Sequence, residues 1–118
     1  MQIDSLSFYG SILRVKCSGV FGVGSEGNPS GELLNSSIKN WMESHPGARV
    51  EQINIDLNEV DYSWGDGPIS SLIAFISQGV TKFCFIAGPQ NLKPLQNLIK
   101  MSGLPGFTVE MTDCNASV

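Results

Sequence analysis

The hydrophobic pattern changes its period once between residues 51 and 76. Apolar residues first alternate with polar ones, which predicts a strand with one face in a core. A segment rich in glycine and proline follows. Apolar residues then recur every three or four positions, which predicts a helix with one buried stripe. The apolar positions are Ile53, Ile55 and Leu57 in the strand and Ile69, Leu72, Ile73 and Ile76 in the helix.

The rest of the chain also alternates strands with helices. Further strands are expected at 5–9, 11–20, 82–87 and 107–111, and further helices at 30–44 and about 92–101. The first two strands predict an antiparallel hairpin at a sheet edge, and 82–87 is apolar enough for an inner strand buried on both faces. The order β-β-α-β-α-β-α-β predicts a single α/β domain over residues 1–118. Its sheet is expected to be mixed, with four or five strands and three main helices.

Capping residues and apolar stripes define the two flanking helices. Asn28 or Ser30 is expected to cap the first, while Pro94 and Gly103 fit the first turn and the C-cap of the second. The stripes are Leu34, Ile38, Trp41 and Met42 in the first helix and Leu92, Leu95, Leu98, Ile99 and Met101 in the second. Residues 112–118 are predicted to form a frayed tail.

Charge and cysteine content narrow the functional classes. A net charge of −4 argues against general affinity for nucleic acid or anionic membranes. Cys17, Cys84 and Cys114 have no metal-binding spacing and cannot all pair, which favours a reduced, cytoplasmic setting. The first residues do not resemble a signal peptide, and no apolar run approaches membrane-spanning length. We therefore expect a cytoplasmic protein without a metal or cofactor.

The segment Gly22–Gly27 formally matches the GxGxxG pattern of dinucleotide-binding loops. That function requires a strand-to-helix turn at which the helix opens at once. Here Asn28-Pro29 follows, and the chain is short for the usual fold with two halves. A flexible connecting loop is the favoured interpretation. The alternative is a small ligand- or nucleotide-binding α/β protein, or a minor enzyme, that uses this loop.

The loop before the middle helix concentrates the candidate functional residues. Asp66 can cap that helix and Pro68 suits its first turn, and the free N–H groups of the helix start are expected to favour anions. Trp64 either folds back onto the helix or stands exposed as an interaction hot spot. The one histidine, His45, ends a helix and is interpreted as a favourable end charge. No convergent carboxylates, nucleophile elbow or metal cluster is recognisable, so no enzymatic activity is predicted.

These features together resemble the STAS domain, the family of anti-sigma-factor antagonists and of the cytoplasmic tails of sulphate transporters. Ile55-Asp56-Leu57 is similar to the family's strand end, and Asp66 to its loop aspartate. The resemblance extends more weakly over most of the chain, through the buried strand and the Leu-rich helix that follow. It implies a mixed sheet of four or five strands with helices packed around it, and a bacterial signalling module that regulates transcription.

The resemblance also implies a mechanism. Family members bind a kinase or anti-sigma factor around this loop and helix, and phosphorylation of a hydroxyl beside the aspartate abolishes binding. Here that position is Gly67, so we expect constitutive binding or a different partner. The resemblance also leaves weak affinity for a nucleotide open. The implied partner-binding residues are Ser63, Trp64, Asp66, Gly67, Ser70 and Ser71. A shifted correspondence would move phosphorylation to Ser63, Ser70 or Ser71.

Overall fold

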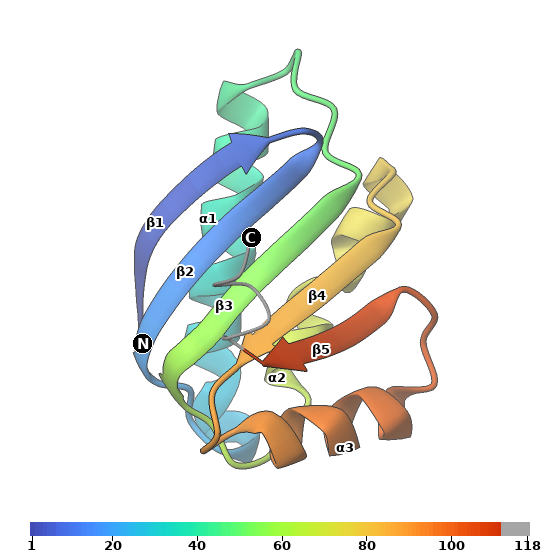
Figure 1. The fold of residues 1–118 in the computed structure, drawn as a ribbon. Helices are drawn as coiled ribbons and strands as arrows, with labels where there is room; N and C mark the ends of the chain where they lie inside the picture. The colour runs from blue at the N-terminus through green and yellow to red at the C-terminus, as the bar shows by residue number, and fades with distance from the viewer. Residues whose placement is uncertain (112–118) are drawn as a thin grey trace.

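The computed structural model describes residues 1–111 of the chain as one sheet with helices packed against it (Figure 1). The predictions for the tail at 112–118 and for Cys114 lie outside these residues. The strands are β1 (Gln2–Tyr9), β2 (Ile12–Val20), β3 (Gln52–Asp61), β4 (Lys82–Ala87) and β5 (Phe107–Met111). The helices are α1 (Asn28–Ser44), α2 (Gly67–Ser70) and α3 (Leu92–Ser102), with 3-10 segments η1 (Gly24–Gly27) and η2 (Ile73–Gln78).

The sheet has five strands in sequential order, β1-β2-β3-β4-β5. β1 pairs antiparallel with β2, and all later neighbours are parallel. The predicted α/β class, the mixed sheet and the edge hairpin are therefore confirmed, and the arrangement is STAS-like. Because each crossover moves one strand in the same direction and crossovers of this kind are right-handed, the helices gather on one face of the sheet (Figure 1).

The core forms between that face and the helices. Register places Leu13, Ile53, Phe83 and Phe107 in one row across four strands, with Val15, Ile55, Phe85 and Val109 in the next. Leu34 and Ile38 of α1, Ile69 of α2, Phe75 of η2 and Leu95 of α3 belong to the same apolar cluster. As predicted, β4 is buried at every position from Phe83 to Ala87.

The middle helix differs from the prediction. α2 is a single turn, and the chain tightens into 3-10 geometry from Ile73. A 3-10 helix has three residues per turn, so the residues spaced by three, Ile69, Leu72 and Phe75, face the core. Ile73 and Ile76 are 45% and 43% exposed. The predicted stripe was therefore wrong at these two positions, because its four-residue spacings assumed a continuous α-helix.

The ends of α1 also differ in detail. The helix begins at Asn28 with Gly27 at the N-cap, and no side chain caps it. The expectation that Asn28 or Ser30 would cap was wrong, since Ser30 instead donates its hydroxyl to the carbonyl oxygen of Val20 at 3.4 Å. At the other end His45 is the C-cap residue, and its ring stacks on Trp41 with centroids 4.1 Å apart.

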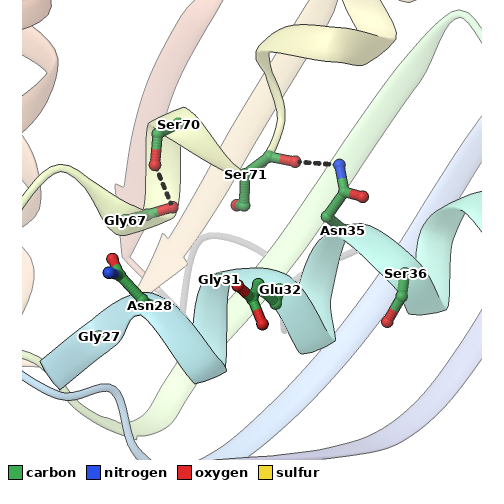
Figure 2. A pocket seen from close by; sticks show the side chains of 9 residues that line it. All are labelled: Gly27, Asn28, Gly31, Glu32, Asn35, Ser36, Gly67, Ser70 and Ser71. Atoms are coloured by element: carbon green, nitrogen blue, oxygen red, sulfur yellow. Dashed lines mark hydrogen bonds between the residues drawn. The ribbon is translucent and has the colours of Figure 1, made fainter. Parts of the chain in front are cut away.

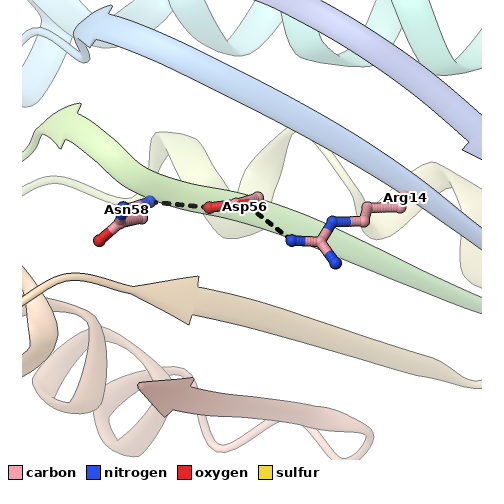
Figure 3. Close-up of polar contacts among 3 residues, drawn as sticks. All are labelled: Arg14, Asp56 and Asn58. Atoms are coloured by element: carbon pink, nitrogen blue, oxygen red, sulfur yellow. Dashed lines mark hydrogen bonds and ion pairs between the residues drawn. The ribbon is translucent and has the colours of Figure 1, made fainter. Parts of the chain in front are cut away.

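Asp56 lies on the face of the sheet opposite the core. It is within β3, five positions before the strand ends at Asp61, so the sequence-based placement of Asp56 at the strand end was wrong. The nearly buried Asp56 carboxylate accepts a hydrogen bond from the Arg14 guanidinium at 2.9 Å and from the backbone N–H of Asn58 at 3.1 Å (Figure 3). Asp56 thus ties β2 to β3 and does not reach the Ser63–Ser71 segment.

Candidate functional site

The loop between β3 and α2 is held in place by two contacts of Tyr62, one with Phe21 and one with Gly65. Tyr62 is buried, contacts Phe21 edge-on with ring centroids 6.0 Å apart, and donates its hydroxyl to the Gly65 carbonyl oxygen. Burial and the nearby Asp66 raise the Tyr62 pKa to about 12, so the phenol remains protonated and a donor at neutral pH. The loop that carries Trp64 is therefore fixed to the core by Tyr62.

Trp64 leaves its indole 60% exposed on this anchored loop. The ring rests on Gly24 of the neighbouring glycine-rich segment, where a β-carbon would come within 2.7 Å of the indole Cη2. Of the two interpretations left open by the sequence, exposure is the correct one. Trp64 does not fold into the core, and the absence of a side chain at Gly24 sets its position.

Trp64 forms one wall of an apolar groove of about 500 Å³ between this loop and α3. We call it the Trp64 groove and define it by Trp64 and Ile69 on one side, Pro94, Leu98 and Met101 of α3 on the other, and the exposed Asp66. The Met101 side chain is 84% exposed, although the sequence pattern assigned it to the buried stripe of the helix. That assignment was wrong, because Met101 lies beside the core-facing Leu95 stripe.

Sequence reasoning missed the contribution of α3 to this site. Pro94, Leu98 and Met101 follow one another at four- and three-residue spacing, which is itself a helical stripe next to the core-facing one. That spacing was the available signal. Its meaning depended on α3 lying beside the loop that follows β3, a fact that no local pattern contains.

The predicted site residues divide between two hollows separated by α2. Ser63, Trp64 and Asp66 line the Trp64 groove, whereas Gly67, Ser70 and Ser71 line a second, polar hollow of about 450 Å³ between α2 and α1 (Figure 2). In that second hollow Asn35 reaches across from α1 and donates its amide to the Ser71 carbonyl oxygen at 2.9 Å. The Ser63–Ser71 segment is thus not one continuous docking surface.

The three candidate phosphorylation sites differ in accessibility. Ser63 and Ser70 are exposed, and the Ser70 hydroxyl donates to the Gly67 carbonyl oxygen at 3.3 Å. Ser71 is buried, and its hydroxyl donates to the Pro68 carbonyl oxygen at 3.1 Å. A kinase could therefore reach Ser63 or Ser70 on the folded protein, but not Ser71.

Gly67 occupies a position that has no room for a hydroxyl-bearing side chain. A β-carbon at Gly67 would lie 2.5 Å from Cε1 of the Phe21 ring, which belongs to the core. The packing around Gly67 therefore leaves no room for a phosphorylatable side chain at this position. A serine at this position requires Phe21 to move.

The start of α2 is not the anion-binding helix end that the sequence suggested. Pro68 has no N–H group, and the N–H groups of Ile69 and Ser70 both donate to the Asp66 carbonyl oxygen, at 3.0 and 2.8 Å. The Asp66 side chain makes no capping hydrogen bond, contrary to the sequence-based expectation. The amides of Ile69 and Ser70 are therefore occupied, and the exposed Asp66 carboxylate adds negative charge beside the groove.

The glycine-rich segment lies where a βαβ unit would place a phosphate-binding loop. It connects β2 directly to α1, because Asn28 is already helical and does not delay the helix as the sequence suggested. Its glycines, however, are in contact with the chain itself. Besides the indole over Gly24, a β-carbon at Gly27 would lie 2.5 Å from the Gly22 carbonyl oxygen.

Residues 1–111 contain no cluster of three or more His, Cys, Asp or Glu side chains that could hold a metal ion. Within the same residues, none of the helices has both the length and the apolar character needed to cross a membrane. Comparison with known proteins finds no family model that matches the chain and no match among curated proteins.

Proposed function

We propose that the protein is a non-catalytic regulatory interaction module of the STAS type, located in the cytoplasm. It binds a protein partner, a kinase or an anti-sigma factor, through the Trp64 groove and the adjoining start of α2. The observation that carries the proposal is Trp64, a large aromatic side chain held exposed by Gly24 beneath it. Tryptophan is enriched among the residues that dominate binding energy at protein interfaces.

Three further features support this assignment. The groove is lined by the same loop that the family resemblance assigns to partner binding, which supports the proposal. The groove walls are apolar. One wall is held in place by the hydrogen bond between Tyr62 and Gly65, and the other is formed by α3. Asp66 gives the site an acidic group, which favours a partner segment that presents an apolar side chain flanked by a basic one.

The regulatory consequence follows from Gly67. With no hydroxyl at that position and Phe21 filling the space, the family's phosphorylation switch is absent there. We propose that binding is constitutive, or that control passes to a modification of the exposed Ser63 or Ser70. Ser63 lines the Trp64 groove, so a phosphate on it would add charge directly to the interface.

The alternative function, ligand or nucleotide binding at Gly22–Gly27, is favoured by the position of that loop between β2 and α1. Two observations weigh against it. In the part of the chain that the structure describes, the strand order never reverses, so the sheet lacks the topological switch point at which α/β folds open a ligand crevice. In addition, Trp64 occupies the space over Gly24 that a phosphate would need.

The test uses Trp64 as its own reporter. Trp41→Phe leaves Trp64 as the single tryptophan, and titration with a candidate kinase or anti-sigma factor should shift its emission to shorter wavelength as the groove is filled. Calorimetry should show affinity reduced at least about tenfold by Trp64→Ala and by Met101→Ala. Ile76→Ala, an exposed apolar residue outside the groove, is the matched control and should bind like the wild type.

Binding unaffected by both groove variants would contradict the proposal. Incubation with ATP and the kinase, followed by mass spectrometry, asks whether Ser63 or Ser70 is modified. Tight nucleotide binding that survives Asp66→Ala but is lost in Gly24→Val would establish the alternative function instead.

A further inference from the structure

The outer side of β1 is an unpaired strand edge. Among residues 1–111, β1 is the first strand of the sheet and pairs only with β2. Gly10 and Ser11, with φ of +57° and +69°, form the two-residue turn of the hairpin, so Tyr9 and Ile12 are its closing hydrogen-bonded pair.

From that closing pair the backbone groups of β1 alternate in direction. Those of Ser7 face Arg14 on β2, whereas the N–H and C=O groups of Leu6 and Phe8 face away from the sheet. Such groups are satisfied by water in the monomer and are a template for a further strand.

This edge has little of the protection that exposed edges usually carry. Its bulge lies at the beginning, between Ile3 and Ser5, and pairing is regular from Ser5 to Tyr9. The strand's one charged side chain, Asp4, is directed toward neighbours, since its carboxylate accepts from Gln2 Nε2 at 2.8 Å and from Ser18 Oγ at 3.1 Å. Residues 5–9 contain neither a charge nor a proline, the usual devices that prevent edge pairing.

The side of α1 next to this edge is uncharged as well. Leu33, Ser37 and Trp41 recur at four-residue spacing along it, and the Trp41 ring lies 5.2 Å from that of Phe8. Leu33 and Phe8 are each 36% exposed. The charged residues of the helix lie off this line, at Glu32, Lys39 and Glu43.

We propose that β1 pairs antiparallel with β1 of a second copy of this chain, about a two-fold axis through Ser7. Leu6 of each copy then exchanges backbone hydrogen bonds with Phe8 of the other, and the two sheets become continuous. The Leu33–Trp41 sides of the two α1 helices lie on the same side of the joined sheet. This contact is self-complementary, as a two-fold interface must be.

The lack of charge at this edge favours a second copy over an acidic or a basic partner. Two chains of net charge −4 repel each other, and an uncharged contact surface keeps that repulsion smallest. An acidic or basic partner would find no complementary charge here. The edge is separate from the Trp64 groove, which lies between α2 and α3, so dimer formation and partner binding can be tested independently.

Ser7→Glu is the discriminating variant. In the monomer the new carboxylate lies across from Arg14, a favourable cross-strand pair, whereas in the dimer two carboxylates meet at the axis. Sedimentation equilibrium should show a reversible wild-type dimer whose dissociation constant rises at least about tenfold in Ser7→Glu. Ser7→Thr, and Gln96→Glu, which adds the same charge on exposed α3, should dimerise like the wild type.

Hydrogen exchange locates the contact. The amides of Leu6 and Phe8 should become protected as the protein concentration rises, and remain unprotected in Ser7→Glu. A wild-type chain that is still monomeric at about 1 mM overturns the proposal. So does a dimer that Ser7→Glu leaves unchanged, or one that forms without protecting these two amides.

Discussion

The indole of Trp64 lies directly on the backbone of Gly24. A β-carbon at Gly24 would come within 2.7 Å of the ring, and φ at Gly24 is +53°, a conformation that favours glycine. Two segments 40 positions apart in the sequence (64 − 24) are thereby joined, and the candidate interface depends on a residue that does not itself line the Trp64 groove.

This contact predicts that Gly24→Ala displaces Trp64. We expect a changed tryptophan emission in the Trp41→Phe background and weaker partner binding, because the added methyl group occupies the space of the ring. Gly10→Ala is the matched control, since Gly10 has nearly the same φ but nothing within 4 Å of its added β-carbon. Both variants should lose about 1 kcal/mol from backbone strain. Equal emission spectra in the two would contradict the Trp64–Gly24 contact.

A serine at position 67 should destabilise the protein, and it should not create a phosphorylation switch of the kind that STAS proteins have. Gly67→Ser and Gly67→Ala are expected to lower the free energy of unfolding alike, by about 1–3 kcal/mol, because either β-carbon meets the Phe21 ring. Urea denaturation measures the loss. Introducing Phe21→Leu should reduce the additional cost of Gly67→Ser, which a double-mutant cycle will detect. A Gly67→Ser protein as stable as the wild type would show that Phe21 does not restrict this position.

Substitution of Asn91 should lower the stability of the fold more than most other single changes. It is fully buried, its amide donates to the Leu57 and Val60 carbonyl oxygens at 2.8 Å, and its own oxygen accepts from the Gly88 N–H at 3.0 Å. Asn91→Asp replaces both donors with a buried carboxylate facing two carbonyls, and should cost about 3 kcal/mol or more. Thermal unfolding compares it with Asn97→Asp, an exposed change on α3, the helix that follows Asn91, which should have little effect.

The two arginines allow the partly buried Arg14–Asp56 ion pair to be compared with an exposed one. Arg14 is bonded to the nearly buried Asp56 at 2.9 Å, whereas Arg49 and Glu51 are mostly exposed and 3.5 Å apart. Arg14→Ala should destabilise by about 1–2 kcal/mol because it leaves a carboxylate without its cation, while Arg49→Ala should stay within about 0.5 kcal/mol. The Arg14 effect should persist in high salt, and its disappearance there would argue against a partly buried pair.

The free energy of unfolding should decrease at alkaline pH because the pKa of Tyr62 is raised in the folded protein. Its pKa is near 12 in the folded protein and about 10 when unfolded, so between these values only the unfolded state loses the proton. The contribution is complete below pH 10 and is lost as the pH rises toward 12. Tyr62→Phe should cost about 1 kcal/mol at pH 7, from the lost bond to Gly65, and should decline less steeply above pH 10.

Denaturant titrations of both proteins from pH 8 to pH 11 test this prediction. Cys17, whose burial raises its pKa to about 12, contributes a similar decline from about pH 9. Because Cys17 is present in both chains, the difference between the two curves isolates Tyr62. Parallel curves above pH 10 would contradict the prediction.

Local pattern was sufficient for the elements and their order. Alternation over Ile53–Leu57, the fully apolar run at 82–87 and the glycine at the hairpin turn each indicate a backbone geometry through their own periodicity or conformational freedom. The pattern failed over 69–76, where both three- and four-residue spacings were present. Only the packing of Phe75 into the core shows which of them the chain adopts.

The sequence by itself therefore determined the α/β class, the mixed sheet and the edge hairpin. Tertiary structure alone decided that the predicted surface is divided by α2 and that Met101 lines the Trp64 groove. It also decided that Phe21 leaves no room for a side chain at Gly67 and that Asp56 binds Arg14 on the other face of the sheet. The physical reason is that the spacing of apolar residues indicates which face of a helix or strand is buried. Exposure and contact of a given side chain depend on which distant segment packs against that face.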